Sequence, residues 1–177
     1  MSKKVLILGG SPRKGGNSDI LCDEFRKGAE AAGHMVEKIR LQEKKINYCL
    51  ACYGCRETGK CVQKDDANEI IEKMQAADVI VLATPVYFYS MSGQMKTIID
   101  RAVAKWTQII DKEFYFIATA AEEAPSMERT MEALAGFTDC LTGAVVKGKI
   151  YGEGVYQKGE VKATNAMQEA YRMGQSV

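Results

Sequence analysis

Short apolar runs alternate with amphipathic stretches along the whole chain. Four apolar runs have the length and composition of buried strands, at 4–8, 78–84, 113–119 and 144–151, and 35–41 alternates as a half-buried strand does. Between and after these runs, apolar residues recur at helical spacing over 17–32, 70–77, 92–106, 126–140 and 159–173. Because parallel strands need long crossover connections, the alternation predicts a five-stranded parallel sheet with helices on both faces.

The composition is that of one soluble globular domain spanning 1–177. The 177 residues are 46% hydrophobic and 27% charged, and no repeat or low-complexity linker divides them. Lys and Arg total 24 against 23 Asp and Glu, so no bulk charge draws the chain to nucleic acid or to an acidic membrane. The apolar runs are too short to span a bilayer and no cleavable leader develops, so we expect a cytoplasmic protein.

The segment GGSPRKGGNS (9–18) follows the first predicted strand and opens the first predicted helix. In open parallel sheets ligands bind beyond the carboxyl ends of the strands, so we expect the chemistry in the loops after strands one, three and four. The segment matches neither the dinucleotide-binding nor the Walker pattern. It does offer phosphate-binding side chains beside a helix N-terminus, at Ser11, Arg13, Asn17 and Ser18. The alternative is an ordinary turn with a helix cap at Asn17 or Ser18.

Three segments in chain order resemble one protein family. They are GGSPRKGGNS (9–18), TPVYFYSMSGQMKTIIDRA (84–102) and YGEGVYQKGEV (151–161), and they are similar to segments of the NADPH-dependent FMN reductases, a flavodoxin-like group. The resemblance covers nearly the whole chain. It implies a flavodoxin-like three-layer sandwich with strand order 2-1-3-4-5, noncovalently bound FMN, and NADPH or NADH as the electron donor.

The aromatic segment after the third predicted strand is the expected wall of the flavin ring. A flavin needs a flat apolar wall and backbone N–H groups directed at its ring. The resemblance implies that the edge of the ring is contacted by Pro85, Val86, Tyr87, Phe88 and Tyr89. After the fourth predicted strand, the residues expected beside the ring or the ribityl chain are Thr119 and Ala120. The alternative for the aromatics is simple packing of the loop against the core.

Four of the six cysteines fall in one connection, after the second predicted strand, in CLACYGCRETGKC (49–61). Disulfides are rare in the cytoplasm, so this spacing indicates metal or redox chemistry. Compact runs of this kind supply the thiolates of iron–sulfur clusters, and the run is similar to that of the iron–sulfur flavoproteins, a branch of the same superfamily with a 4Fe–4S cluster beside FMN. The expected ligands, on the sheet edge that holds the flavin, are Cys49, Cys52, Cys55 and Cys61. A zinc site and unligated thiols remain the alternatives.

The remaining cysteines and the histidine carry no predicted chemistry. Cys22 and Cys140 are far from the other four along the chain, and we expect core or surface thiols there. His34 is the one histidine and follows a helix-ending glycine, so it is expected to be an exposed turn residue. With one histidine and no Ser or Asp paired with it, the sequence argues against histidine-based triad hydrolysis.

The sequence as a whole favours an FMN-dependent NAD(P)H oxidoreductase. Electrons would pass from the nicotinamide through FMN to a quinone, a flavin or another small-molecule acceptor, and this step needs no protein general base. A 4Fe–4S cluster would relay single electrons to an outside carrier such as a ferredoxin-type protein. The resemblance implies a homodimer or a dimer of dimers. The alternatives are a flavodoxin-type electron carrier, which the near-neutral charge disfavours, and a redox sensor.

Overall fold

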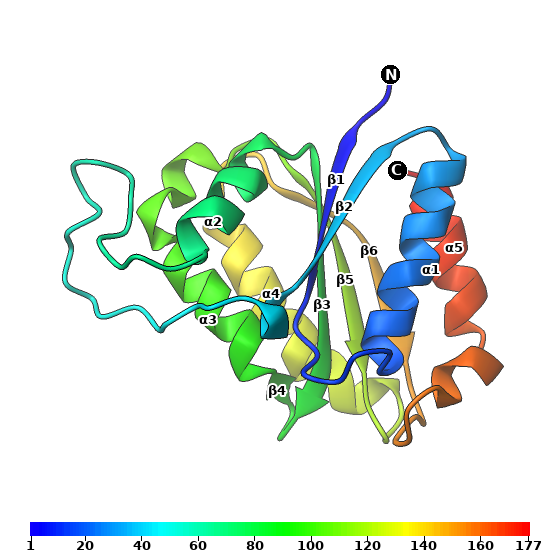
Figure 1. The fold of residues 1–177 in the computed structure, drawn as a ribbon. Helices are drawn as coiled ribbons and strands as arrows, with labels where there is room; N and C mark the ends of the chain where they lie inside the picture. The colour runs from blue at the N-terminus through cyan, green and yellow to red at the C-terminus, as the bar shows by residue number, and fades with distance from the viewer.

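The computed structural model describes residues 1–177 and has a parallel sheet at its centre (Figure 1). The parallel strands are β1 (Lys4–Gly9), β2 (Met35–Arg40), β3 (Val79–Tyr87), β5 (Glu113–Thr119) and β6 (Val145–Gly152). Their order across the sheet is β2-β1-β3-β5-β6. Counted along the chain as five parallel strands, this is the predicted order 2-1-3-4-5, and the flavodoxin-like architecture is confirmed.

A sixth, short strand is absent from the sequence prediction. β4 (Ser90–Met91) pairs antiparallel with the end of β3, matching Val86 with Met91 and Tyr87 with Ser90. β3 therefore continues beyond the predicted 78–84 into the segment expected to contact the flavin. The hydrophobic pattern misses this extension because a proline followed by apolar and aromatic residues shows no period-two alternation.

Helices cover both faces of the sheet, as predicted. α1 (Asn17–Ala31) and α5 (Ala166–Gln175) lie on one face, and α2 (Ala67–Ala76), α3 (Gly93–Arg101) and α4 (Glu128–Asp139) lie on the other (Figure 1). Each face has its own apolar core. Neighbouring residues of β1 belong to different cores, Ile7 to the one under α1 and α5 and Leu8 to the other. A central parallel strand is apolar throughout because both of its faces are covered.

Two predicted helices are shorter in the structure. The helix predicted over 92–106 ends at Arg101 and continues as 3-10 turns at Ala102–Ala104 and Trp106–Gln108. Val103 and Trp106, which fit the buried face of a longer helix, are 51% and 45% exposed because the helix has ended before them.

The closing helix also begins later than the predicted 159–173. Gly159 has φ +93, in the left-handed region, and is followed by a 3-10 turn at Glu160–Ala163. Thr164 is extended, so α5 starts only at Ala166. None of the helices combines the length and the apolar character needed to cross a membrane.

Glycines allow α1 and α5 to pack backbone against backbone. A Cβ atom on Gly28 would stand 2.1 Å from the carbonyl oxygen of Tyr171, and one on Gly174 would stand 2.1 Å from that of Phe25. Real Cβ atoms do not approach backbone that closely, so a larger residue at either position separates the helices. This close packing holds the C-terminal half of α1 against α5.

The connection between β2 and α2 is the longest excursion from the core. It projects from the side of the molecule beyond α2 and α3, whereas the loops after β1, β3, β5 and β6 gather at the carboxyl edge of the sheet (Figure 1). The predicted phosphate and flavin segments belong to that edge, and the predicted metal ligands belong to the projecting connection. The predicted flavin site and the predicted metal site therefore lie in two separate regions of the molecule.

Candidate functional site

The loop between β1 and α1 presents unpaired hydrogen-bond donors at the start of α1. Gly16 is the N-cap residue, and no side chain caps the helix, so the predicted alternative of a cap at Asn17 or Ser18 is wrong. The backbone N–H groups of Asn17, Ser18 and Asp19 have no acceptor within the protein. Three free donors at the positive end of a helix dipole form an anion site of the kind that holds phosphate.

Polar and cationic side chains border this anion site. The hydroxyl of Ser11, a buried residue, accepts a hydrogen bond from the backbone N–H of Arg13 at 3.2 Å, which shapes the loop. The Arg13 guanidinium is exposed and donates to the carbonyl oxygen of Tyr156 at 3.4 Å. The side chain of Lys158 lies against Gly15 on the same side. A phosphate at the start of α1 would thus meet two cations, of which the sequence analysis named only Arg13.

The Asn17 side chain ties the loop after β1 to the loop after β6. Its oxygen accepts from the N–H of Gly159 at 2.9 Å, and its amide nitrogen donates to the carbonyl oxygen of Gln157 at 2.9 Å. The predicted phosphate contact of this residue is therefore left to its backbone N–H. The sequence could not show this, because the partner residues lie about 140 positions away along the chain.

A buried carboxylate beneath the loop is neutralised by two cations. Asp19 accepts the N–H of Gly15 at 2.7 Å and pairs with Lys38 at 2.6 Å and with Arg40 at 3.4 Å. Burial alone would raise the pKa of Asp19, but these hydrogen bonds and charges hold that pKa below its ordinary value. Because its charge is balanced locally, Asp19 can fix the loop with little repulsion of an anion bound above it.

The β3–β4 hairpin turns at two aromatic residues in the left-handed region. Phe88 has φ +50 and Tyr89 φ +60, values that cost a non-glycine residue energy. Phe88 is fully exposed, while Tyr87 and Tyr89 are about half exposed. The alternative that these aromatics pack against the core is wrong for Phe88. The turn holds apolar side chains in solvent at the place where the sequence predicts a flavin ring.

A hollow of about 250 Å³ joins this hairpin to the loop after β5. It is lined by Val86, Phe88, Tyr89 and Ala120, all predicted ring contacts, together with Ala121, Glu122 and Ser126. Thr119 is buried next to the hollow at the end of β5. The N–H of Ala120 donates to the carbonyl oxygen of Gly152 at 3.0 Å, so β6 supports the loop.

Two hydroxyl groups that the sequence analysis missed hold the loops together. The Ser92 hydroxyl is fully buried, donates to the carbonyl oxygen of Gly10 at 2.8 Å and caps α3 by accepting the N–H of Met95. The Thr84 hydroxyl accepts the N–H of Ser92 at 2.9 Å. A serine three residues before Met95 has the spacing of an N-cap, and that signal could have located this residue. The carboxyl edge is thus one hydrogen-bonded unit.

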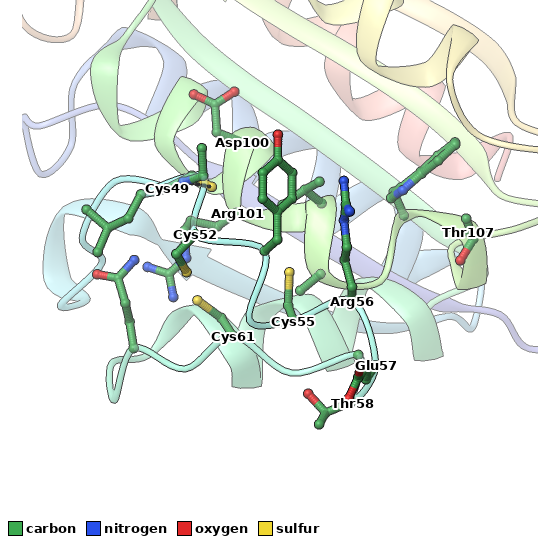
Figure 2. Close-up of a pocket in the computed structure, with 18 of the residues that line it drawn as sticks. Cys49, Cys52, Cys55, Arg56, Glu57, Thr58, Cys61, Asp100, Arg101 and Thr107 are labelled. Carbon is green, nitrogen blue, oxygen red and sulfur yellow. Dashed lines mark hydrogen bonds between the residues drawn. The ribbon is translucent and has the colours of Figure 1, made fainter.

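A second cavity, of about 670 Å³, lies between the cysteine connection and the end of α3. All four predicted ligands line it, and its opposite wall comes from Arg101 and the 3-10 turns after α3 (Figure 2). Cys49 and Cys52 are exposed, and Cys55 and Cys61 are partly buried. No three acidic, histidine or cysteine side chains in the structure are arranged to hold a metal ion. The thiols share one cavity without converging on one point.

The two ends of the cysteine connection, at Asn47 and Asp65, meet beside a buried ion pair, and we call this place the neck of the connection. Asp65 receives hydrogen bonds from both terminal nitrogens of Arg101, at 2.7 and 2.9 Å, and from the N–H of Asn47 at 2.9 Å. The side chains of Asp65 and Arg101 are 0% and 1% exposed. Although burial raises the pKa of Asp65, the hydrogen bonds hold that pKa below its ordinary value. Sequence spacing could not show this pair, because Asp65 and Arg101 lie 36 positions apart along the chain.

Within the connection, Cys61 is the most firmly placed cysteine. The Asn68 side chain accepts the Cys61 N–H at 2.9 Å and donates to the Cys61 carbonyl oxygen at 3.0 Å. At the other end of the run, Ala51 and Tyr53 have φ +49 and +59, and the N–H of Ala51 donates to the Cys49 sulfur at 3.4 Å. Bent backbone with N–H groups directed at sulfur suits thiolates that carry charge.

Contrary to our expectation from the sequence, the cysteines do not lie at the edge of the sheet that carries the predicted flavin contacts. Their cavity is walled by residues 100–108, at the end of α3, whereas Ser92 caps the start of α3 beside the loop after β1. α3 has 9 residues and is therefore about 13 Å long. The two regions stand at opposite ends of one short helix.

The other predicted positions have structural roles. His34 is partly buried; its Nδ1 accepts the N–H of Lys3 at 3.1 Å and its Nε2 lies 2.9 Å from the carbonyl oxygen of Val177. It joins the two ends of the chain rather than standing free in a turn. Cys22 is buried in the core, where burial raises its pKa to about 12, and Cys140 is exposed. None of the three belongs to either region.

The chain is similar in sequence to curated iron-sulfur flavoproteins. An iron-sulfur flavoprotein of Methanocaldococcus jannaschii is 36% identical over 136 residues, which is 76% of this chain and 70% of the relative. An iron-sulfur flavoprotein of Archaeoglobus fulgidus is 46% identical over 99 residues, covering 56% of this chain and 44% of the relative. The chain thus spans less than half the length of this second relative.

Solved structures and family models agree with the fold. The structure of an NAD(P)H:quinone oxidoreductase from Methanothermobacter marburgensis superimposes with a TM-score of 0.79 at 18% identity, covering 99% of this chain and 96% of the other. At that identity the likeness supports the fold alone. The family model described as NADPH-dependent FMN reductase matches residues 3–155. The chain therefore belongs to the NADPH-dependent FMN reductase family.

Proposed function

We propose that the protein is an FMN-dependent NAD(P)H oxidoreductase. The observation that carries the proposal is the set of three N–H groups without acceptors at the start of α1, at the carboxyl edge of a flavodoxin-like sheet. Flavodoxin-like folds bind FMN at this switch point. The family membership of residues 3–155 supports the same assignment.

The phosphate of FMN is assigned to the loop after β1. The backbone N–H groups of Asn17 and Ser18, the hydroxyls of Ser11 and Ser18 and the guanidinium of Arg13 supply the contacts. Arg13 gives a charge-assisted hydrogen bond, which is stronger than a neutral one. Asn17 acts with its side chain on the loop after β6, so it supports the site as well as lining it.

The flavin ring is assigned to the hollow between the β3–β4 hairpin and the loop after β5. The ring contacts are Pro85, Val86, Tyr87, Phe88, Tyr89, Thr119 and Ala120. When bound, FMN supplies the redox chemistry, taking electrons from NADPH or NADH and passing them to an acceptor. These residues would hold the ring, and the bound flavin would pass electrons from the nicotinamide to a quinone, a flavin or another small acceptor.

We further propose that Cys49, Cys52, Cys55 and Cys61 hold a 4Fe–4S cluster. Four soft ligands line one cavity, one already receives an N–H hydrogen bond, and the curated relatives are named iron-sulfur flavoproteins. A bound cluster supplies one-electron transfer to an outside carrier of the ferredoxin type. Since the thiols do not converge in this structure, the exposed part of the connection must close around the metal.

Association with a second copy is part of the proposal. Large apolar side chains are exposed in both regions, Tyr87, Phe88 and Tyr89 at the hairpin and Tyr48, Leu50, Tyr53 and Trp106 around the cysteines. Exposed aromatic patches of this kind mark protein interfaces. We expect a homodimer or a dimer of dimers, which light scattering on the purified protein measures directly.

Steady-state kinetics test the proposed activity. Purified protein reconstituted with FMN is mixed with NADPH or NADH, and with a quinone, free flavin or ferricyanide as acceptor. We expect oxidation of the nicotinamide that depends on bound FMN and on the acceptor. Arg13→Ala should lower the rate at limiting FMN, whereas Lys14→Ala, a change at the neighbouring exposed lysine, should not. Failure to bind FMN, or binding without any nicotinamide oxidation, contradicts the proposal.

A further inference from the structure

One of the three guanidinium nitrogens of Arg101 is buried without a hydrogen-bond partner. The first terminal nitrogen donates to the Asn47 carbonyl oxygen and to Asp65, both at 2.7 Å, and the second donates to Asp65 at 2.9 Å. The Nε–H group is buried and has no acceptor. Buried donors are nearly always paired, so an unpaired one in a rigidly held guanidinium points to a missing partner.

The unused donor belongs to the wall of the cysteine cavity. Arg101 lines the cavity together with the four cysteines (Figure 2), and its guanidinium interacts with the Cys61 side chain. The two side chains are neighbours, and Nε of Arg101 has no hydrogen-bond partner in this structure. Cys61 is also the cysteine whose backbone is fixed on both sides by Asn68. A fixed donor therefore stands next to a fixed thiol.

The ion pair with Asp65 explains how a charged arginine can be buried there. Asp65 balances the charge and holds the guanidinium in one orientation by its bidentate contact. Of the three guanidinium nitrogens, only Nε is buried without any protein acceptor. An anionic group in the cavity is the chemistry that it suits.

We propose that Arg101 donates its Nε–H group to the Cys61 sulfur of the cluster-bound quartet, and so places that ligand and raises the reduction potential of the cluster. The inference rests on the proposed 4Fe–4S site. Hydrogen bonds to cluster sulfurs and nearby positive charge favour the more negative, reduced state. Arg101 acts through a ligand, so it is a positioning residue rather than a catalytic one.

A second arginine in the same cavity provides a matched comparison. Arg56 also lines the cavity, but it is exposed, and its guanidinium stacks on the Tyr53 ring at 3.9 Å from the ring centre. It has no buried ion pair that fixes its direction. If general positive charge in the cavity were the cause, both arginines would matter equally; the proposal requires Arg101 alone.

The test compares Arg101→Lys with Arg56→Lys in anaerobically reconstituted full-length protein. A lysine keeps the positive charge beside Asp65, but its single nitrogen cannot span both Asp65 and Cys61. We expect Arg101→Lys to hold less iron per chain and to have a more negative cluster potential in a redox titration followed by EPR. Arg56→Lys should match the wild type in both. FMN content and the urea midpoint report the fold of each variant.

A measurement on the Arg56→Lys protein avoids dependence on the folding of Arg101→Lys. Protein labelled with ¹⁵N-arginine is reduced, and pulsed EPR of the cluster should detect an arginine nitrogen coupled to it. An unchanged potential in Arg101→Lys, an equal shift in Arg56→Lys, or no arginine coupling overturns the inference. Absence of any cluster in the reconstituted wild type is a different result, because it removes the proposed metal site and with it this inference.

Discussion

The loops at the carboxyl edge and the cysteine connection are built in opposite ways. At the edge, side chains such as Asn17 and Ser92 tie loops from different strands together, and the donors for a phosphate are in place without a ligand. The cysteine connection is tied at its neck by Asp65 and at Cys61 by Asn68, while Cys49 and Cys52 stand exposed.

The two regions differ in what fixes their structure. The fold builds the edge site, because a parallel sheet brings its loops together wherever the strands end. The cysteine connection has few buried apolar contacts of its own, and we infer that a metal completes its order, since metal binding and local folding are coupled in such sites. Changes at one region should therefore leave the other largely intact, and four predictions test this independence.

The largest expected effect is on iron content. Cys61→Ser removes one of the proposed ligands and should abolish most bound iron and sulfide, while FMN content should stay unchanged because the proposed FMN site lies at the other end of α3. Cys140→Ser, a change at an exposed thiol outside the cavity, is the control and should keep the iron. Parallel loss of FMN and iron in Cys61→Ser would show that the two regions are coupled.

Breaking the ion pair at the neck should cost about 3–5 kcal/mol of unfolding free energy, because Asp65→Asn leaves the Arg101 charge buried without its partner. The pKa of Asp65 is lower in the folded protein, so its contribution is present above the unfolded pKa and is lost as the pH falls through the folded pKa. The difference in urea stability between the two proteins should thus begin to shrink below about pH 4 and disappear only below the folded pKa of Asp65. A difference that is independent of pH would contradict the assigned pair.

Arg13→Ala should weaken FMN binding about tenfold or more, since a charge-assisted contact is worth roughly 1.5–3 kcal/mol. The measurement is quenching of flavin fluorescence on titration with protein. Lys14→Ala serves as the control for loss of a nearby positive charge. Iron content should be equal in both variants. Unchanged FMN affinity in Arg13→Ala would place the phosphate elsewhere.

The smallest effect is expected at the β3–β4 hairpin. Replacing Phe88 by Asn and Tyr89 by Gly removes two non-glycine residues from the left-handed region and should stabilise the protein by about 1 kcal/mol in urea. The same double change deletes two proposed ring contacts and should weaken FMN binding. A variant that is less stable than the wild type would mean that the aromatic turn supports the fold rather than the flavin.

The sequence predicts the fold and the family, and it misses the long-range contacts in both regions, for a physical reason. Strand order and the loop 9–18 follow from local hydrophobic pattern and from residue chemistry over short spans, and the comparisons confirm the fold and family. The partners of Asn17 and Arg101 lie far along the chain, so spacing could not reveal them. The position of the cysteines depends on where α3 ends, and apolar residues at Val103 and Trp106 suggested a longer helix.

The most direct test of the two-region account is the cofactor stoichiometry of protein purified and reconstituted without air. Flavin, iron and acid-labile sulfide are measured on one sample with its visible spectrum. The account predicts about one FMN, identified by mass spectrometry, and about four irons with four sulfides per chain. One FMN with less than about one iron per chain would contradict the cluster, and FAD as the main flavin, or no flavin at all, would contradict the site at the carboxyl edge.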